Sequence, residues 1–304
     1  MRWDDFRRSD NIEDRRDDDP SEQGGFGGAR RAGGLGIGTI VVLGLIGWAL
    51  GIDPRLLIGG AEILTGGDQS AQAPAAGPRE TGSPDDQVGQ FVAAVLGDTE
   101  DRWTEILQPA GLAYQAPKLV MFSGATRSAC GFAQAAMGPF YCPNDQKVYL
   151  DTSFFQEIET RFRGCQVGSS ACRFSQAYVI THEVGHHVQN LLGILTKAQD
   201  MQRELSKAEA NHLQVRIELQ ADCFAGVWAN RSQQKLKFLD PGDIEAALQT
   251  ASAIGDDRLQ KQAQGYIVPD AFTHGSSEQR KRWFTAGFNS GSPGGCNTFE
   301  AAQL

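Results

Sequence analysis

Hydrophobic and polar residues are unevenly distributed along the chain, and the pattern divides it into four parts. Residues 1–32 are rich in Asp, Arg and Gly with few apolar side chains, which predicts a disordered tail. Residues 33–52 carry no charge and include an apolar run from Leu35, which predicts a helix across a bilayer. Residues 53–87, with Gly, Ala, Pro, Ser and Gln prominent from residue 66, predict a flexible linker, and residues 88–304 have the periodic patterns of a folded domain.

The pattern from residue 86 onward predicts an α+β domain in which helices dominate. Residues 86–96 and 102–107 have the apolar spacing of two helices, and residues 118–122 and 147–151 resemble strands. A short helix opens near residue 152 and a long one covers residues 198–232. Further helices begin at Asp240, followed by a proline in the first turn, and at Ser276 or Ser277. We therefore expect a small sheet and many helices.

The stretch from Phe174 to Leu195 contains no proline and carries an HExxH motif from His182 to His186. On a helix, side chains four residues apart differ by about 40° in azimuth, so both imidazoles face one side and can bind one ion. Zinc binds imidazole nitrogen well, and Glu183 between the histidines would act as a general base on zinc-bound water. The alternative is a pair of surface histidines, but the flanking residues are apolar enough for burial.

A second helix can supply the third zinc ligand. An apolar stripe recurs along it at helical spacing, through Leu213, Ile217, Ala221, Phe224 and Trp228. Glu218 and Asp222 lie next to this stripe, and two buried carboxylates need a cation nearby. We expect Glu218 to bind one Zn²⁺ and Asp222 to accept the ring N–H of a ligand histidine. The alternative is a solvated acidic face.

Several motifs resemble known metallopeptidases. HExxH followed about thirty residues later by ExxxD resembles the ligand pattern of the gluzincins, and residues 273–280 (THGSSEQR) resemble the His-plus-Arg element of membrane-bound prenyl-protein proteases and their bacterial heat-shock relatives. Residues 122–124 (FSG), 128–131 (SACG), 138–143 (GPFYCP) and 147–151 (KVYLD) resemble the bacterial neutral zinc metallopeptidase family. The resemblance covers roughly Trp3 to Cys296. It implies a zincin fold and peptidase activity.

The same resemblance implies roles for residues outside the zinc motif. It makes His274 a candidate catalytic residue that stabilises the transition state, with a helix-capping or surface histidine as the alternative. Arg280 would fix a carboxylate or contact substrate, unless it is a solvated helix charge. Val148, Tyr149 and Leu150 would form an edge strand that pairs with extended substrate, or else be plain sheet core. Gly275 departs from the prenyl-protease pattern, which usually has proline there.

Charged residues around the apolar run predict its orientation. Arg30 and Arg31 precede it, and Arg55 is the nearest cation after it. The positive-inside rule then places the N-terminus in the cytoplasm and residues 88–304 in the periplasm or outside the cell, with one pass through the inner membrane. A cleaved signal peptide is the alternative, but the preceding tail is long and acidic and no cleavage site follows promptly.

The cysteines and the overall charge narrow the class of protein further. All six cysteines lie after residue 129, which agrees with an oxidising compartment, and the short spacings of Cys130 with Cys142 and of Cys165 with Cys172 suit local disulfides. Cys223 would pair with Cys296 or remain a buried thiol. The net charge is −9 without a basic stripe, so we expect no nucleic-acid partner.

These patterns lead to two functional hypotheses. The first is a membrane-anchored zinc metalloendopeptidase that acts on protein or peptide substrates and contacts the bilayer through residues 33–52. The second is a non-catalytic envelope binding module that holds zinc for structure. Glu183 favours the first, because a structural zinc has no need of a base. A fourth protein ligand, from His274 or Cys223, would favour the second.

Overall fold

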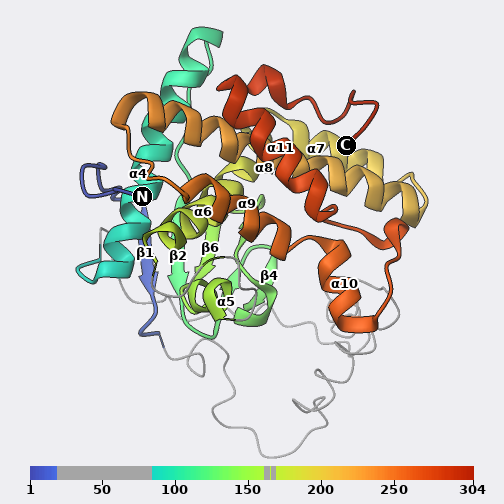
Figure 1. The fold of residues 1–304 in the computed structure, drawn as a ribbon, viewed down its shortest axis with the longest axis horizontal. Coiled ribbons are helices and arrows are strands. Elements are labelled where there is room, and N and C mark those ends of the chain that lie inside the picture. Colours follow the sequence, from blue (N-terminus) through green and yellow to red (C-terminus); the bar gives the residue numbers. More distant parts are fainter. Residues whose placement is uncertain (19–83, 161–164, 166–168) are drawn as a thin grey trace, which may run out of the picture. The chain divides into compact units, whose positions relative to one another are not determined.

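The computed structural model describes residues 1–18, 84–160, 165 and 169–304 (Figure 1). Its helices are α4 (Gln87–Leu107), α5 (Phe154–Thr160), α6 (Ser170–Leu191), α7 (Ile194–Gln202), α8 (Lys207–Leu236), α9 (Asp243–Ala253), α10 (Asp256–Gln264) and α11 (Ser277–Ser290). Its strands are β1 (Ile12–Arg15), β2 (Lys118–Phe122), β3 (Ala125–Ser128), β4 (Gly131–Gln134), β5 (Phe140–Cys142) and β6 (Lys147–Asp151). Helices predominate over a small sheet, which agrees with the predicted α+β class.

The predicted membrane segment is not among the residues just given. None of the helices in the described part of the chain is long and apolar enough to cross a membrane. The predicted anchor at residues 33–52 lies outside the described residues, and so does the predicted linker as far as residue 83.

The main sheet has the strand order β1-β2-β6-β5. β1 and β6 both pair with β2 in parallel, and β5 pairs with the other edge of β6 in the antiparallel sense. β6 is therefore an interior strand, and Val148, Tyr149 and Leu150 are each 1% exposed. Of the two alternatives that the sequence left open, the structure favours plain sheet core, because β2 pairs along one edge of β6 and β5 pairs with Lys147, Val148 and Tyr149 along the other. β5, which covers one of those edges, spans only three residues and offered little pattern to recognise.

Residues 1–18 belong to the folded domain, so the prediction of a disordered tail is wrong for this part of residues 1–32. Strand β1 extends the sheet, and Phe6 and Ile12 are buried in the main core. The backbone N–H of Ser9 donates to the carbonyl of Ala93 in α4, over 2.9 Å. Arg7 contacts the Glu100 carboxylate of the same helix over 2.6 Å. Several of the charged residues that suggested disorder, including Arg7 and Glu13, instead form ion pairs with residues elsewhere in the domain.

A buried ion cluster secures β1 to the sheet. Glu13 lies 2.6 Å from Arg15 and 2.7 Å from Lys147 of β6, and it is 5% exposed. Burial opposes its charge, but the two cations lower the pKa of Glu13 from 4.5 to about 2. A carboxyl whose pKa is depressed by folding stabilises the fold above its unfolded pKa and loses that effect as the pH falls.

We expect Glu13→Gln to lower the free energy of unfolding of the full chain by about 2 kcal/mol at pH 7, because it leaves Arg15 buried with a weaker partner. The difference from wild type should shrink as the pH falls from 4.5 towards 2, where the wild-type carboxyl takes up a proton. Urea unfolding at several pH values measures both effects. The exposed Glu204 offers a matched Glu→Gln control. A pH-independent difference would contradict the ion-cluster explanation.

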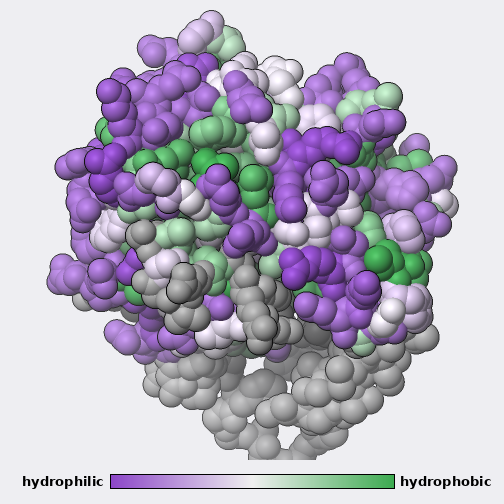
Figure 2. All heavy atoms as spheres, viewed as in Figure 1, coloured by the Kyte–Doolittle hydropathy of each residue, from purple (hydrophilic) through white to green (hydrophobic). Residues whose placement is uncertain are grey.

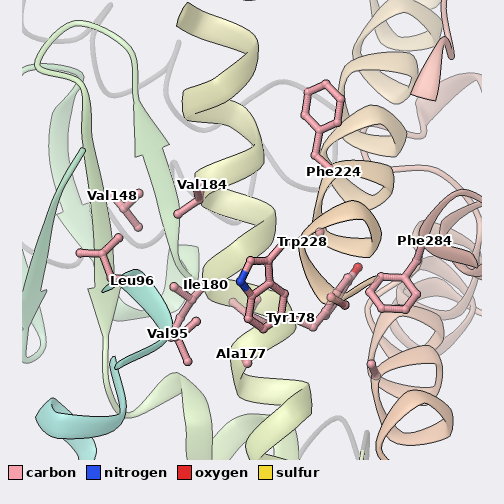
Figure 3. Packing of buried hydrophobic residues seen from close by; sticks show 14 of the residues in the cluster. Val95, Leu96, Val148, Ala177, Tyr178, Ile180, Val184, Phe224, Trp228 and Phe284 are labelled. Carbon is pink, nitrogen blue, oxygen red and sulfur yellow. The ribbon is translucent and has the colours of Figure 1, made fainter. Parts of the chain in front are cut away.

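Helix α6 passes through the core between the sheet and the other long helices. Figure 3 shows Ile180 and Val184 of α6 pointing towards β6 and α4, while Tyr178 points towards α8 and α11. Trp228 of α8 stacks on Phe174 of α6 with ring centroids 6.2 Å apart. These core contacts hold α6 and α8 at a fixed position relative to each other.

The face seen in Figure 2 is mainly hydrophilic, with hydrophobic residues in small groups between the polar ones.

Three helix predictions differ from the structure. The helix expected to begin at Asp240 begins at Asp243 instead, as α9, with Gly242 as its N-cap. The two helices expected over residues 86–107 are one continuous helix, α4. Asp98, near the middle of this helix, is buried and accepts a hydrogen bond from Trp228 Nε1 over 2.8 Å. The long helix expected over residues 198–232 is divided into α7 and α8, and Ser206 begins α8 in a capping box with Glu209. At α11 the predicted start is confirmed, with Ser276 as the N-cap.

Candidate active site

His182, His186 and Glu218 come together in the interior of the domain. The histidines lie on α6 and the glutamate on α8, and one ligand atom from each lies within 4.8 Å of the others. Glu218 Oε2 is 3.2 Å from His182 Nε2 and 3.5 Å from His186 Nε2. Two imidazole nitrogens and a carboxylate oxygen are a donor set that zinc prefers. The three residues therefore fit a zinc ion.

The charges around this cluster attract a cation. Burial alone would raise the pKa of Glu218, but the neighbouring histidines lower it well below its usual value. Burial alone would lower the pKa of His182, but Asp222 and Glu218 raise it to about 10. The carboxylates of this cluster and of Asp222 thus stabilise positive charge in the interior, as a metal site requires.

A close helix crossing makes the convergence possible. Gly185 lies inside the HExxH motif, and a Cβ atom there would stand 3.0 Å from the Ala221 carbonyl oxygen and 3.1 Å from the Ala221 Cα. Glycine costs roughly 1 kcal/mol of helix propensity relative to alanine, yet here it lets the backbones of α6 and α8 approach. Glu218 and Asp222 flank Ala221 on α8, so the crossing brings both carboxylates to the histidines.

His182 is oriented by a buried ion pair. Its Nδ1 lies 2.8 Å from Asp222 Oδ1. Arg280 of α11 donates to both carboxylate oxygens of Asp222 over 2.9 Å, and Tyr178 donates to Oδ1 over 2.5 Å. Burial opposes the charge of Asp222, but Arg280 and His182 lower its pKa to about 2. An ionised Asp222 accepts the Nδ1–H of His182, so in the neutral ring that a metal binds, the Nε2 lone pair faces Glu218.

The geometry distinguishes between the roles open to Arg280. This residue is 3% exposed, and its guanidinium is engaged by Asp222 and by Tyr178, whose oxygen accepts a hydrogen bond over 3.1 Å. Arg280 therefore fixes a carboxylate and is neither a solvated helix charge nor placed to contact substrate.

Glu183, the candidate general base, is buried beside the cluster. It directly follows His182 on α6 and is 8% exposed. Its negative charge contributes to raising the pKa of His182 and of His186, in each case against the effect of burial. The carboxylate is thus within electrostatic range of both histidines.

His274 lies on a loop that the start of α10 holds in place. Asp256 Oδ2 accepts the backbone N–H groups of Thr273, His274 and Gly275 over 2.7, 2.6 and 3.0 Å. The His274 side chain is 51% exposed, and its Nδ1 lies 3.3 Å from Asp256 Oδ1. The surrounding protein disfavours the charged ring, but Asp256 raises the pKa of His274 above its usual value, and the charge of His274 in turn helps to lower the pKa of Glu218. His274 is therefore close enough to interact electrostatically with Glu218 of the cluster.

Gly275 explains why this loop departs from the proline-containing pattern. Its φ is +93°, a left-handed conformation that proline cannot adopt. A Cβ atom there would also lie 3.2 Å from Leu219 Cδ2 on α8. The loop therefore packs closely on α8, one residue after His274.

All six cysteines form disulfides. Cys130–Cys142 and Cys165–Cys172 are the two local pairs that the spacing suggested. The sequence left open whether Cys223 is a buried thiol or pairs with Cys296. It pairs with Cys296, and this disulfide ties α8 to the C-terminal segment. Cys223 therefore has no thiolate to offer a metal.

Sequence reasoning missed three polar residues around the cluster. Tyr178 supports Asp222, Gln189 contacts His186, and Asp256 holds the His274 loop. Tyr178 stands four residues before His182 and Gln189 three after His186, so helical spacing could have indicated both. No local pattern marks Asp256, because its partners lie 17 to 19 residues away.

Two histidines one turn apart, a glutamate from a second helix and a glutamate within the motif define the class of HExxH zinc hydrolases. The family described as "Putative neutral zinc metallopeptidase" matches residues 1–299 of the chain. The chain belongs to this family, and the resemblance seen in its sequence motifs is confirmed.

Relatives of this chain occur in Escherichia coli and in Mycobacterium species. It is 46% identical over 299 residues to uncharacterized protein YpfJ of Escherichia coli K12, covering 98% of this chain and 99% of that protein. It is 42% identical over 233 residues to uncharacterized proteins Mb2605 of Mycobacterium bovis and Rv2575 of Mycobacterium tuberculosis, covering 74% of this chain and 75% of each of them. No solved structure matches the chain.

We expect Gly185→Ala to weaken zinc binding even though alanine favours the helix. The added Cβ would push α6 away from Ala221 and move Glu218 from the histidines, so the zinc dissociation constant should rise about tenfold, the scale seen when metal ligands lose their alignment. Competition with a chelator measures this constant. Gly89→Ala in α4, where the new Cβ would meet the Pro84 side chain, is a control for steric strain away from the site. Unchanged zinc affinity in Gly185→Ala would contradict the close-crossing argument.

Proposed function

We propose that this protein hydrolyses peptide bonds with one zinc ion held by His182, His186 and Glu218. The observation that carries the proposal is the convergence of these side chains beside the buried carboxylate of Glu183. Zinc, when bound, supplies Lewis acidity that lowers the pKa of a coordinated water and polarises a carbonyl oxygen. Membership of a zinc metallopeptidase family supports a peptide or protein substrate.

Glu183 has the role of general base in this proposal. Its carboxylate accepts a proton from the attacking water and then delivers that proton to the leaving amine. His274 has the role of hydrogen-bond donor to the oxygen that gains negative charge during the attack. The surrounding protein disfavours the charge of His274, but Asp256 raises the pKa of this ring and so supports the role by favouring its protonated form.

The non-catalytic binding module remains the second candidate, but two observations favour the enzyme. A structural zinc site is closed by four protein ligands, whereas the metal-ligand group found among the described residues contains three. Of the two side chains considered as a fourth ligand, Cys223 is bonded to Cys296, and His274 does not belong to that three-residue group.

The variant Glu183→Gln tests the proposed chemistry. We expect kcat/KM on casein or a fluorogenic peptide panel to fall by roughly 10²–10⁴-fold, because an amide cannot accept the proton. Zinc content should stay at one ion per chain, since Glu183 is not a ligand in this proposal. Equal cleavage by the variant would remove Glu183 from the mechanism. Zinc-loaded wild type without turnover on any substrate would favour the binding module.

We also propose that the domain lies outside the cytoplasm and that residues 33–52 attach it to the membrane. Three disulfides within the domain support an oxidising compartment. The pairing of β1 with β2 adds a condition, because strands cannot form hydrogen bonds across a bilayer. Residues 1–18 therefore belong on the same side as the domain, and this proposal replaces the cytoplasmic N-terminus expected from Arg30 and Arg31.

Labelling in right-side-out membrane vesicles tests this arrangement. Asp5→Cys and Glu278→Cys place single thiols at an exposed position of the N-terminal segment and on α11 of the domain. A membrane-impermeant maleimide should label both to the same extent without detergent. Labelling of Asp5→Cys only after detergent, with Glu278→Cys labelled before it, would contradict the shared compartment.

A further inference from the structure

The second zinc-ligand candidate, His186, is held by a chain of two buried glutamines. His186 Nδ1 lies 2.9 Å from Gln189 Oε1. Gln189 Nε2 donates to the backbone carbonyl of Ile217 over 2.8 Å and to Gln220 Oε1 over 3.0 Å. Gln220 Nε2 donates to the backbone carbonyl of Cys296 over 3.0 Å. The chain therefore runs from the Cys223–Cys296 disulfide across α8 to the metal cluster.

Two backbone carbonyls set the direction of every hydrogen bond in this chain. A carbonyl oxygen can only accept, so the Ile217 carbonyl requires the NH₂ group of Gln189 and the Cys296 carbonyl requires the NH₂ group of Gln220. Turning either amide around would bring two acceptors together in the interior. The oxygen of Gln189 therefore faces His186 and can only accept from it.

This direction determines the tautomer of His186. Because Gln189 Oε1 accepts, Nδ1 of His186 carries a hydrogen, and in the neutral ring that a metal binds, Nε2 then carries the lone pair. Nε2 is the atom that lies 3.5 Å from Glu218 Oε2. Gln189 is fully buried and Gln220 is 6% exposed. An amide group left without its partner would therefore be destabilising, because water cannot replace the lost hydrogen bond.

The chain also connects the backbone elements that carry the ligands. Ile217 immediately precedes Glu218, so the bond from Gln189 ties α6 to α8 beside the third ligand. The disulfide holds Cys296 against α8, and the Cys296 carbonyl holds Gln220. His182, in contrast, is oriented by the carboxylate of Asp222.

We propose that Gln189 and Gln220 are positioning residues that act in series to hold His186 with its Nε2 lone pair directed at the metal. Gln189 acts directly on the ring, and Gln220, anchored on the carbonyl of the disulfide-bonded Cys296, acts only through Gln189. This inference rests on the proposed zinc site, because it concerns the ligand geometry of that site.

A double-mutant cycle on the full chain tests the proposal, with zinc affinity measured by chelator competition. We expect Gln189→Met and Gln220→Met each to raise the zinc dissociation constant by about tenfold or more, the scale for groups that orient a ligand. If they act in series, the double variant should bind zinc no more weakly than Gln189→Met alone. Gln220→Glu keeps the shape but cannot donate to the Cys296 carbonyl, so it should also weaken binding.

Gln176→Met is the matched control, because Gln176 is a buried glutamine on α6 without a contact to the cluster. Its zinc affinity should equal that of wild type. The absorption spectrum of the cobalt-substituted protein gives a second readout. It should change in the Gln189 and Gln220 variants and not in the control. Additive losses of zinc affinity in the double variant, or unchanged zinc affinity in all Gln189 and Gln220 variants, would overturn the serial arrangement. Wild type that binds no zinc would overturn the proposed function as well.

Discussion

The close crossing of α6 and α8 is the constraint on which the candidate site depends. Metal–ligand bonds are about 2 Å long, so side chains from two helices can share an ion only where their backbones come near. Gly185 over Ala221 provides that approach. The surrounding core, including Trp228 stacked on Phe174, resists separation of the two helices. The disulfide between Cys223 and Cys296 ties α8 to the C-terminal segment.

Burial of several carboxylates imposes the second constraint. Glu183, Glu218 and Asp222 are all less than 9% exposed, and unpaired charges at such positions would be costly. Arg280 compensates Asp222, and the histidines compensate Glu218. The two histidines have different partners, a carboxylate for His182 and an amide for His186. The amide of Gln189 orients a ring without adding another negative charge. The three carboxylates can therefore be balanced by one divalent metal ion and Arg280.

The N-terminal segment shows how charge composition can mislead. Residues 1–18 are rich in aspartate and arginine and contain few apolar side chains, a composition that is typical of disordered tails. In the fold these charges have specific partners on α4 and β6, and Ile12 and Phe6 supply the few apolar contacts that the core needs. The family match begins at residue 1, which agrees with a segment that belongs to the domain. The proposed membrane attachment through residues 33–52 must therefore be compatible with a sheet that contains β1, before these residues in the sequence, and β2, after them.

The sequence by itself indicated the cluster of His182, His186 and Glu218, the helices that carry it and the two local disulfides, because each depends on spacing over a few residues. His182 with His186, and Glu218 with Asp222, are related by one helical turn, and periodicity records such relations. Only the tertiary structure decided that β6 is an interior strand, that Arg280 supports Asp222, that Cys223 pairs with Cys296 and that β1 joins the sheet. These contacts join residues far apart in the chain, and their formation depends on which surfaces pack together, a property that no local pattern encodes.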